Sequence, residues 1–260
     1  MKKLSMTLFL VAGMAFQMFA QTIESVDVSK APDGPFKAET REYTIEGTVV
    51  KGQKEGVWYE LYQNKDRMYL PKKMVSYKNG KRDGLYIEID NTGGITQRAE
   101  YKNDQLDGSV YTWYKGGHLS EMKSYKNGVL DGKQMLCYDR GGTQEESEYK
   151  DGQRHGVTTW YNEAGNKRMS ITYSNGAFEG MQQTFYPNGV IKAEKEYHNN
   201  MLNGTVKEFY EDGSLKSEAL YKDGQMKGKA KVYQEVKKEE KDVKKEEKDV
   251  KKEDAKSKKQ

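Results

Sequence analysis

The aromatic residues are the side chains of this sequence whose type and spacing could support binding. Four tyrosines recur at matching positions along the chain: Tyr114, Tyr138, Tyr186 and Tyr210. Each follows an apolar or small residue, as in Trp113-Tyr114, and adjacent residues on a strand point to opposite faces. If the preceding residue is buried, the tyrosine faces outward, where its ring offers a large contact area at little entropic cost. We expect these four residues, the tyrosine strip, to be a candidate binding surface for a partner or for sugar rings.

Residues capable of catalysis or metal binding are present without a suitable arrangement. The histidines, His118, His155 and His198, fall at different repeat positions, whereas metal ligands must converge. Carboxylates are plentiful, but acid-base catalysis also needs a pocket that shifts their pKa values, which a thin sheet rarely forms. Cys137 takes a position held elsewhere by Trp or Phe, which favours a buried hydrophobe over a nucleophile. We therefore expect no enzyme, no catalytic or metal site and no cofactor.

Composition argues against a thick globular core. Only 35% of the residues are apolar and 32% are charged, and there are 26 glycines but 4 prolines. An aromatic content of 11% is nevertheless too high for a fully disordered chain. The formal charge of +4 falls by two, to +2, without Lys2 and Lys3 of the expected signal. No basic block precedes the charged C-terminal end, so we expect no nucleic-acid partner.

Residues 1–20 have the pattern of an export signal. Two lysines precede a mainly apolar run that extends to Phe19, and Ala20 is a small residue suited to cleavage, although Met18 departs from the preferred small type. The run is short for a membrane span, and an uncleaved anchor is the alternative. The only cysteine, Cys137, cannot form an internal disulfide. We expect an exported protein (periplasmic, outer-surface or secreted), cleaved near Ala20.

The remaining sequence repeats every 24 residues. Seven tyrosines keep this spacing without drift: Tyr77, Tyr101, Tyr125, Tyr149, Tyr173, Tyr197 and Tyr221. A glycine follows each by seven residues: Gly84, Gly108, Gly132, Gly156, Gly180, Gly204 and Gly228. Three residues after the tyrosine, five units have glycine and two have Asp104 or Asn200, residue types that tolerate positive φ. We assign these tyrosines and glycines structural roles and expect a left-handed backbone at the third position.

Each unit has a second turn and a few apolar anchors. Glycine recurs sixteen residues after the tyrosine, and pairs such as Asn188-Gly189 are typical of tight hairpin turns. One anchor position holds Leu61, Ile89, Trp113, Cys137, Phe185 and Phe209, and a second holds Ile95, Leu119, Ile191 and Leu215. One hairpin has too few anchors to fold alone. We therefore expect neighbouring hairpins to bury these anchors by stacking.

The predicted fold is all-β: an elongated antiparallel sheet of stacked 24-residue β-hairpins. The array spans 47–234, as about seven repeats and a terminal half, after a signal peptide (1–20) and a linker or leader segment (21–46). A charged tail (235–260) follows, in which one valine per heptad is too few for a coiled coil, so we expect it to be disordered or helical. Two units are irregular: the first has about four extra residues around 65–70, and in the fifth Trp160-Tyr161 comes one residue early, before a longer turn.

The string Tyr-Lys-Asn-Gly-x-x-x-Gly, closed by an aromatic-Tyr-x-x-Gly turn, resembles the MORN repeat (membrane occupation and recognition nexus). The variant is the bacterial one often labelled YwqK-like antitoxin. Tyr77-Lys78-Asn79-Gly80 with Gly84 carries the motif, as do the equivalent residues from Tyr125 and Tyr173, and the resemblance covers about residues 47–234. It implies a β-hairpin array that serves as a scaffold, a membrane-associated module or a protein-binding surface.

Several functions agree with these patterns. We expect a non-enzymatic interaction scaffold of the bacterial envelope or exterior, with a protein of unknown identity as partner. The same aromatic strip could instead hold peptidoglycan or another cell-wall glycan. A membrane surface is the third possibility, although the near-neutral charge counts against it. The antitoxin label implies a cytoplasmic toxin as partner, which conflicts with the export signal.

Overall fold

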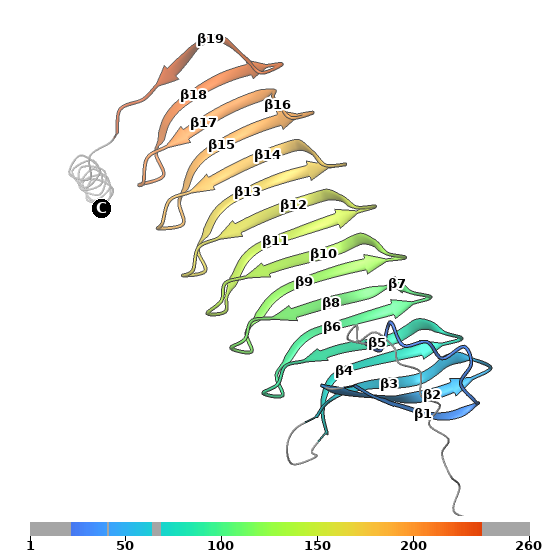
Figure 1. Ribbon diagram of the computed structural model, residues 1–260. Coiled ribbons are helices and arrows are strands. Elements are labelled where there is room, and N and C mark those ends of the chain that lie inside the picture. The colour runs from blue at the N-terminus through green and yellow to red at the C-terminus, as the bar shows by residue number, and fades with distance from the viewer. Residues whose placement is uncertain (1–21, 41, 64–68, 236–260) are drawn as a thin grey trace, which may run out of the picture.

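The computed structural model describes residues 22–40, 42–63 and 69–235, which form one open antiparallel sheet of 19 strands (Figure 1). Each strand pairs with its neighbours in sequence, so the sheet is a meander. The predicted all-β sheet of hairpin repeats is confirmed. The expected signal peptide (1–20) lies outside the described residues, as does the tail (235–260) except Glu235. Within the described part, no helix is long and apolar enough to cross a membrane.

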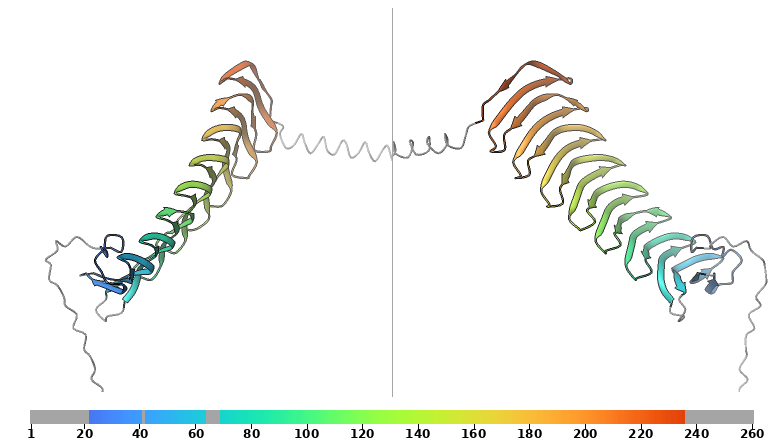
Figure 2. Two further views of the ribbon diagram at one scale, coloured as in Figure 1. Left: turned by 90° about the vertical axis from the view of Figure 1, so that its right-hand side faces the viewer. Right: turned by 60° about the vertical axis from the view of Figure 1, so that its left-hand side comes forward.

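Two pairs of short strands, β7 with β8 and β16 with β17, take the place of one long strand each. Figure 2 shows that the strands are bent along their length. The strands are β1 (Gly34–Glu39), β2 (Tyr43–Val50), β3 (Gln53–Gln63), β4 (Tyr69–Lys78), β5 (Lys81–Ile89), β6 (Ile95–Lys102), β7 (Gln105–Leu106), β8 (Gly108–Trp113), β9 (Leu119–Lys126), β10 (Val129–Cys137), β11 (Thr143–Lys150), β12 (Gln153–Tyr161), β13 (Lys167–Ser174), β14 (Ala177–Phe185), β15 (Ile191–His198), β16 (Met201–Leu202), β17 (Gly204–Phe209), β18 (Leu215–Lys222) and β19 (Gln225–Val232).

Two-residue turns join consecutive strands at one end of the strands. In the unit that begins at Tyr77 both turn residues have positive φ, 51° at Asn79 and 76° at Gly80. Consecutive positive φ values are those of the type I′ turn, whose twist matches the strands that it joins. The expected left-handed backbone is present in all seven units, including those with Asp104 (φ 68°) and Asn200 (φ 66°). The residue before this position, always Asn or Asp, is left-handed as well in all seven units.

Three-residue loops join consecutive strands at the opposite end of the strands. In a representative loop the Tyr186 amide donates to the Val190 carbonyl at 2.8 Å, and the Gly189 amide donates to the Tyr186 carbonyl at 2.9 Å. Of these loop residues only Gly189 has positive φ, at 84°. This is the pattern of a type I turn closed by a left-handed glycine. Asn188-Gly189 therefore closes a three-residue hairpin loop, and the expected second turn is present there.

The glycine seven residues after each tyrosine lies at a β-bulge. Gly84 has φ 109°, and the register shifts beside it between the pairs Val75–Tyr86 and Tyr77–Arg82. A Cβ at this glycine would lie 3.0 Å from the Cβ of Ser76, so a side chain would be crowded as well as strained. Each such glycine from Gly84 to Gly204 also pairs with the tyrosine of the next unit, as Gly84 does with Tyr101. The tyrosine and glycine columns are thus one structural feature.

The bulge of one unit binds the tight turn of the next. The Gly128 amide donates to the Leu106 carbonyl at 2.7 Å, and the Asn127 amide donates to the Asp107 carboxylate at 3.3 Å. Equivalent amide-carbonyl bonds recur in every unit, and an acidic residue fills the position of Asp107 at Glu55, Asp83, Asp131 and Glu179. These bonds couple each unit to its neighbour, as expected for a repeat array.

In the segment 21–46, expected to be a linker or leader, the described residues 22–40 and 42–46 fold with the sheet. The segment contains β1 and the first half of β2, and residues 22–33 lie against the first strands (Figure 1). We call residues 22–33 the N-terminal cover. Its side chains Ile23, Val26 and Val28 are at most 7% exposed. The cover was not predictable from the sequence, because it has no repeat partner and its contacts are distant in sequence.

The fifth unit is regular, contrary to expectation. Tyr161 pairs with Lys167 just as Phe185 pairs with Ile191 in the next unit, 24 residues later. Tyr161 therefore occupies the anchor position, and Asn162 occupies the position of the strip tyrosine. The Trp160-Tyr161 sequence imitates the aromatic-Tyr pair of other units one residue early. In the first unit, the loop residues 64–68 lie outside the described residues.

The anchors are buried less completely than stacking predicted. Leu61 (9% exposed) and Cys137 (7%) are buried, whereas the other members of that position are half-buried and Ile95 is exposed. The reason is that neighbouring hairpins join edge to edge through backbone hydrogen bonds in a single layer. The fully buried side chains concentrate beneath the N-terminal cover.

Candidate interaction surface

Tyr77 and its equivalents lie on one face of the sheet, which we call the tyrosine face. Antiparallel partners share a face, as do residues two apart on a strand, so the pairings define a central row beside these tyrosines. The row holds Trp58, Val75, Tyr86, Ala99, Val110, Lys123, Gln134, Ser147, Thr158, Ile171, Gln182, Lys195, Val206 and Ala219. It is apolar up to Val110, polar from Lys123 to Thr158, and mixed beyond.

The apolar stretch is the part beneath the N-terminal cover. Ile23, Val26 and Val28 pack on a cluster formed by Ile45, Val49, Trp58, Val75, Tyr77, Tyr86, Ala99 and Val110. Trp58 is fully buried and contacts Tyr77 edge-on, with ring centroids 6.3 Å apart. Burial of several aliphatic and aromatic side chains makes this end of the array its main hydrophobic core.

Two charged side chains clamp the backbone of the cover. The Ile23 amide donates to the Glu60 carboxylate at 3.2 Å, and the Lys54 ammonium donates to the Ile23 carbonyl. Glu60 is fully buried and also pairs with Lys72 at 2.5 Å. Burial lowers the pKa of Lys54, because it disfavours the charged ammonium more than the nearby carboxylates favour it. The cover thus provides one hydrogen bond to Glu60 and two to Lys54, which also donates to the Glu24 carbonyl at 3.4 Å.

The polar stretch of the tyrosine face satisfies most of its own charges. Lys123 pairs with Glu121 at 2.8 Å, and Arg154 pairs with Glu145 at 2.6 Å. The Trp160 indole donates to the second Glu145 oxygen at 2.7 Å. Two buried atoms here, the amide oxygen of Gln134 and the hydroxyl of Ser147, have no hydrogen-bond partner among the described residues.

The last stretch of the tyrosine face combines an aromatic row with a mixed central row. We call its aromatic and aliphatic residues the uncovered patch: Ile171, Tyr173, Phe178, Tyr197, Leu202 and Val206. Tyr173 contacts Phe178 edge-on at 5.1 Å between centroids, and Phe178 contacts Tyr197 at 5.6 Å. In the central row, Gln182 and Lys195 lie between Ile171 and Val206. All of the patch residues except the buried Ile171 are half-buried, and Figure 2 shows no described segment lying over these strands.

The tyrosine strip lies at the end of the strands where the three-residue loops are, and it connects successive units. The hydroxyl of each tyrosine donates to a backbone carbonyl of the following unit, at 2.8 to 3.0 Å: Tyr114 to Cys137, Tyr138 to Tyr161, Tyr186 to Phe209 and Tyr210 to Tyr233. Tyr114 is 38% exposed, and the other three are half-buried. The hydroxyls are therefore used within the array, which leaves the ring faces as the part that a ligand could contact.

Two units lack the strip tyrosine, and its replacements bind their own loops. The carboxylate of Asp90 accepts the Gly94 amide at 2.9 Å, and the amide oxygen of Asn162 accepts the Asn166 amide at 2.9 Å. Asp and Asn side chains commonly bond to backbone a few residues ahead. The series of tyrosine hydrogen bonds between units is therefore interrupted at these two units. The replacement of Tyr by Asp or Asn was the sequence signal that this position bonds to the backbone.

The three tryptophans do not form one surface. Trp58 lies beneath the cover, and Trp160 lies on the tyrosine face beside Arg154, whose guanidinium carbon is 5.8 Å from the ring centroid. Trp113 lies on the opposite face, where it stacks on Tyr111 with centroids 6.0 Å apart. A continuous tryptophan platform for sugar rings is therefore absent from the described residues.

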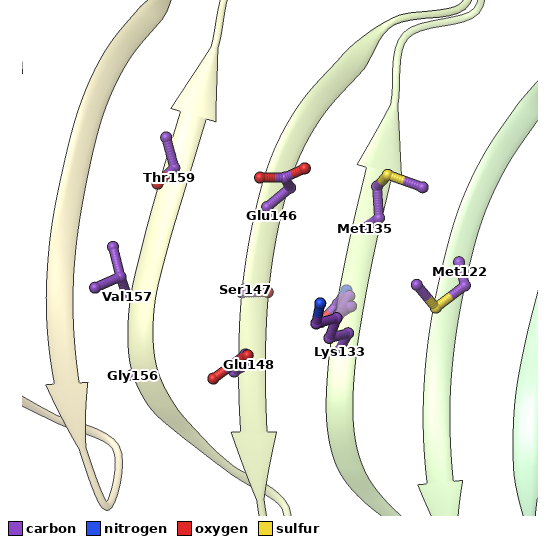
Figure 3. Close-up of a pocket in the computed structure, with 10 residues that line it drawn as sticks. Met122, Lys133, Met135, Glu146, Ser147, Glu148, Gly156, Val157 and Thr159 are labelled. Carbon is purple, nitrogen blue, oxygen red and sulfur yellow. The ribbon is translucent and has the colours of Figure 1, made fainter.

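A shallow hollow of about 570 Å³ lies on the opposite face, over β9 to β12 (Figure 3). Met122, Met135, Glu146 and Thr159 line it in one row of paired residues. Glu146 already accepts the Tyr161 hydroxyl at 2.9 Å. The lining combines thioethers, a hydroxyl and charged side chains without a common point of convergence, so it does not define a reactive centre.

The other chemically capable residues remain apart. Among the described residues no three His, Cys, Asp or Glu side chains are grouped to hold a metal ion. His198 is exposed and contacts Glu179 at 2.6 Å. Cys137 is 7% exposed, and burial raises the pKa of its thiol, which disfavours the reactive thiolate.

Comparison with known families finds a match in four segments of the array. Residues 106–127, 154–175, 178–199 and 202–223 match the model of the MORN repeat variant. Each matched segment begins within a bulge or tight-turn region and ends in the tight turn of the following unit, so the family motif and the structural repeat have the same 24-residue period. No curated protein matches the chain.

Proposed function

We propose that this protein is a non-enzymatic repeat scaffold of the bacterial envelope or exterior that binds a protein partner through its tyrosine face. The observation that supports the proposal most directly is the uncovered patch, whose aromatic row Tyr173, Phe178 and Tyr197 is half-buried and has no described segment over it (Figure 2). Aromatic side chains that remain partly accessible supply a large contact area at little entropic cost. MORN repeat proteins are generally non-catalytic scaffolds for protein or membrane interaction, which agrees with the proposal.

The envelope location rests on the export-signal pattern of residues 1–20. The same pattern disfavours an antitoxin function, because a cytoplasmic toxin would not meet an exported chain. The tyrosine strip remains a second surface within the proposal, limited to its ring faces because its hydroxyls are bonded to the next unit.

Adjacent glutamines provide a matched test. Gln182 belongs to the central row of the tyrosine face, whereas Gln183 pairs with Glu194 on the opposite face. A photo-cross-linking amino acid is placed at either position in the full chain, expressed in its own cells. We expect a discrete protein adduct from position 182 and little from position 183. Absence of an adduct from both positions, or equal adducts from both, would contradict the proposed face.

Cell fractionation tests the location separately. The mature chain should be recovered from the envelope or the medium with residues 1–20 removed. Recovery of the full-length chain from the cytoplasm would contradict the envelope function and would make an antitoxin the better proposal.

A further inference from the structure

We propose that a hollow at the three-residue-loop end of the fifth and sixth units binds the carboxylates of an acidic polysaccharide. This function goes beyond protein binding by the tyrosine face, and it uses residues outside the uncovered patch. The hollow has a volume of about 370 Å³ and is lined by residues of the β12–β13 and β14–β15 hairpins.

Three cationic side chains line this hollow: Lys167, Arg168 and Lys192. All three are exposed, and none forms an ion pair with a described residue. None of the described residues that line the hollow is acidic. Arg154, on the neighbouring part of the sheet, has by contrast a carboxylate partner in Glu145 at 2.6 Å. The hollow thus gathers three positive charges without a counter-charge in its own lining.

The lysine at position 167 departs from the repeat pattern. Its position is the second anchor, which is apolar in other units, at Ile95, Leu119, Ile191 and Leu215. Lys167 is paired across the hairpin in the same register as Ile191, so the lysine occupies an anchor site and gains no ion pair there. A residue that breaks a local rule without a gain in stability is typical of a functional site.

An equivalent hollow, four repeats earlier in the chain, is neutralised by its own residues. It has a volume of about 290 Å³, and Lys72 and Lys73 line it together with Glu88 and Asp90. Lys73 pairs with Glu88 at 3.4 Å, and Lys72 pairs with Glu60 at 2.5 Å. The lining of this hollow therefore holds two cations and two carboxylates.

Neutral residues replace these carboxylates in the hollow of the fifth and sixth units. The repeat places Thr184 at the position of Glu88 and Tyr186 at that of Asp90. Arg168 has the fork of donors that binds a carboxylate through two parallel hydrogen bonds. A carboxylate supplied by a ligand would restore the charge balance of the equivalent hollow.

The cations continue as a column at the same end of the strands. Equivalent positions are cationic in three successive units, at Arg168, Lys192 and Lys216. Neighbours in this column are two strand spacings apart, or about 10 Å. Lys192 lies 5.6 Å from the centre of the Tyr186 ring and Lys216 lies 5.9 Å from that of Tyr210, while the nearest carboxylate of Lys216, on Glu208, is 3.9 Å away.

This alternation of cation and aromatic ring matches an extended polysaccharide that carries one carboxylate per disaccharide. Its charges recur at a spacing comparable to that of the column, and the sugar rings between them can lie on tyrosine ring faces. The hydroxyl of Tyr186 is already bonded to the next unit, so the ring face is the part that remains for a ligand.

Alginate oligosaccharides, which are polymers of uronic acids, are the probe for this site. They are titrated into the purified chain of residues 21–260, and binding is measured by calorimetry. We expect saturable binding that weakens as salt concentration rises. Uncharged cello-oligosaccharides of the same length should bind at least about tenfold more weakly, because they lack the charged contacts.

Each cation can be replaced by a residue that another unit already has at the same position. Lys167→Leu, Arg168→Gln and Lys192→Thr introduce the side chains of Leu119, Gln144 and Thr96. Each change should weaken alginate binding by about three- to tenfold, through loss of one charged contact. Thermal unfolding should be unchanged, because the array accepts these residues elsewhere.

Thr184→Glu restores the carboxylate of the equivalent hollow, so it should weaken alginate binding by about tenfold or more while every cation is kept. Thr184→Gln is its matched control, because it has a similar shape and no charge. Lys150→Gln is the control for net charge, because Lys150 is exposed at the tight-turn end of β11. Both controls should leave binding unchanged.

Several results would overturn the inference. They are an absence of saturable alginate binding, equal binding of the uncharged oligosaccharide, and equal weakening by Lys150→Gln. Equally tight binding of inorganic phosphate would reduce the hollow to a simple anion site, and equally tight binding of poly-glutamate would assign it to an acidic protein. Binding to phosphatidylglycerol vesicles that Arg168→Gln abolishes, without alginate binding, would assign it to a lipid surface. The adduct from position 182 tests the tyrosine face separately, so either proposal can fail alone.

Discussion

Removal of one hydroxyl from the tyrosine strip should weaken the coupling between two units. In Tyr186→Phe the ring stays in place, and only the hydrogen bond to the Phe209 carbonyl, 2.9 Å long and partly buried, is lost. An intramolecular hydrogen bond of this kind contributes about 0.5–1.5 kcal/mol net. Because units of a repeat array contact only their neighbours, the loss should concentrate between the sixth and seventh units.

Urea unfolding and hydrogen exchange measure the two parts of this expectation. The free energy of unfolding should fall by about 1 kcal/mol, and exchange should accelerate in β17 and β18. Phe substitution of all four strip tyrosines should lower the free energy of unfolding by roughly 2–6 kcal/mol, if the contributions of the four hydrogen bonds add. Tyr221→Phe is the control, since its hydroxyl donates to no described residue. A loss below about 0.3 kcal/mol for Tyr186→Phe, or an equal loss in the control, would refute the idea that these tyrosine hydrogen bonds stabilise the array.

Three further predictions concern the bulge and the cover. Gly180→Val places a β-branched residue at φ 103°, which should destabilise the array by about 1–3 kcal/mol and raise local hydrogen exchange; unchanged exchange in β14 would contradict this. Val26→Asp buries a carboxylate at a 7% exposed position, so the cover should detach and become sensitive to protease, while exchange in β17–β19 stays unchanged; a protease-resistant cover would oppose this assignment. Burial raises the pKa of Glu24, but hydrogen bonds, including one from Lys73, outweigh it and hold the pKa below 4.5 in the folded state. Glu24 therefore stabilises the cover at pH values above its unfolded-state pKa, and it loses this effect as the pH falls through its folded-state pKa. Protease sensitivity of the cover should rise below about pH 4.5, and the rise should be smaller in Lys73→Met.

The array was predictable because its determinants are local. Asn79 and Gly80 form a two-residue turn from their own tolerance of positive φ, and the same residue types recur every 24 positions. A periodic sequence in which each unit needs a neighbour then leaves stacked hairpins as the solution. The hairpin turn at Asn188-Gly189 was predictable in the same way, whereas its three-residue length is visible only in the hydrogen bonds between Tyr186, Gly189 and Val190.

The N-terminal cover was not predictable in the same way. Its clamp joins Ile23 to Glu60, which is 37 residues away, and no repeat of residues 22–33 elsewhere in the chain signals the contact. Clustered aliphatic residues at Ile23, Val26 and Val28 were the available signal, but they do not indicate which face of the sheet they occupy.

The sequence by itself determined the repeat, its period, its turns and its all-β class, because these depend on backbone preferences within a few residues. The tertiary structure alone decided what the aromatic residues do. Tyr114 and its equivalents are separated by 23 residues from the carbonyls that they bond, a proximity that arises only when units lie side by side. Burial was decided in the same way: Trp58 is covered and Phe178 is left partly open because a single non-repeating segment reaches only one end of the tyrosine face.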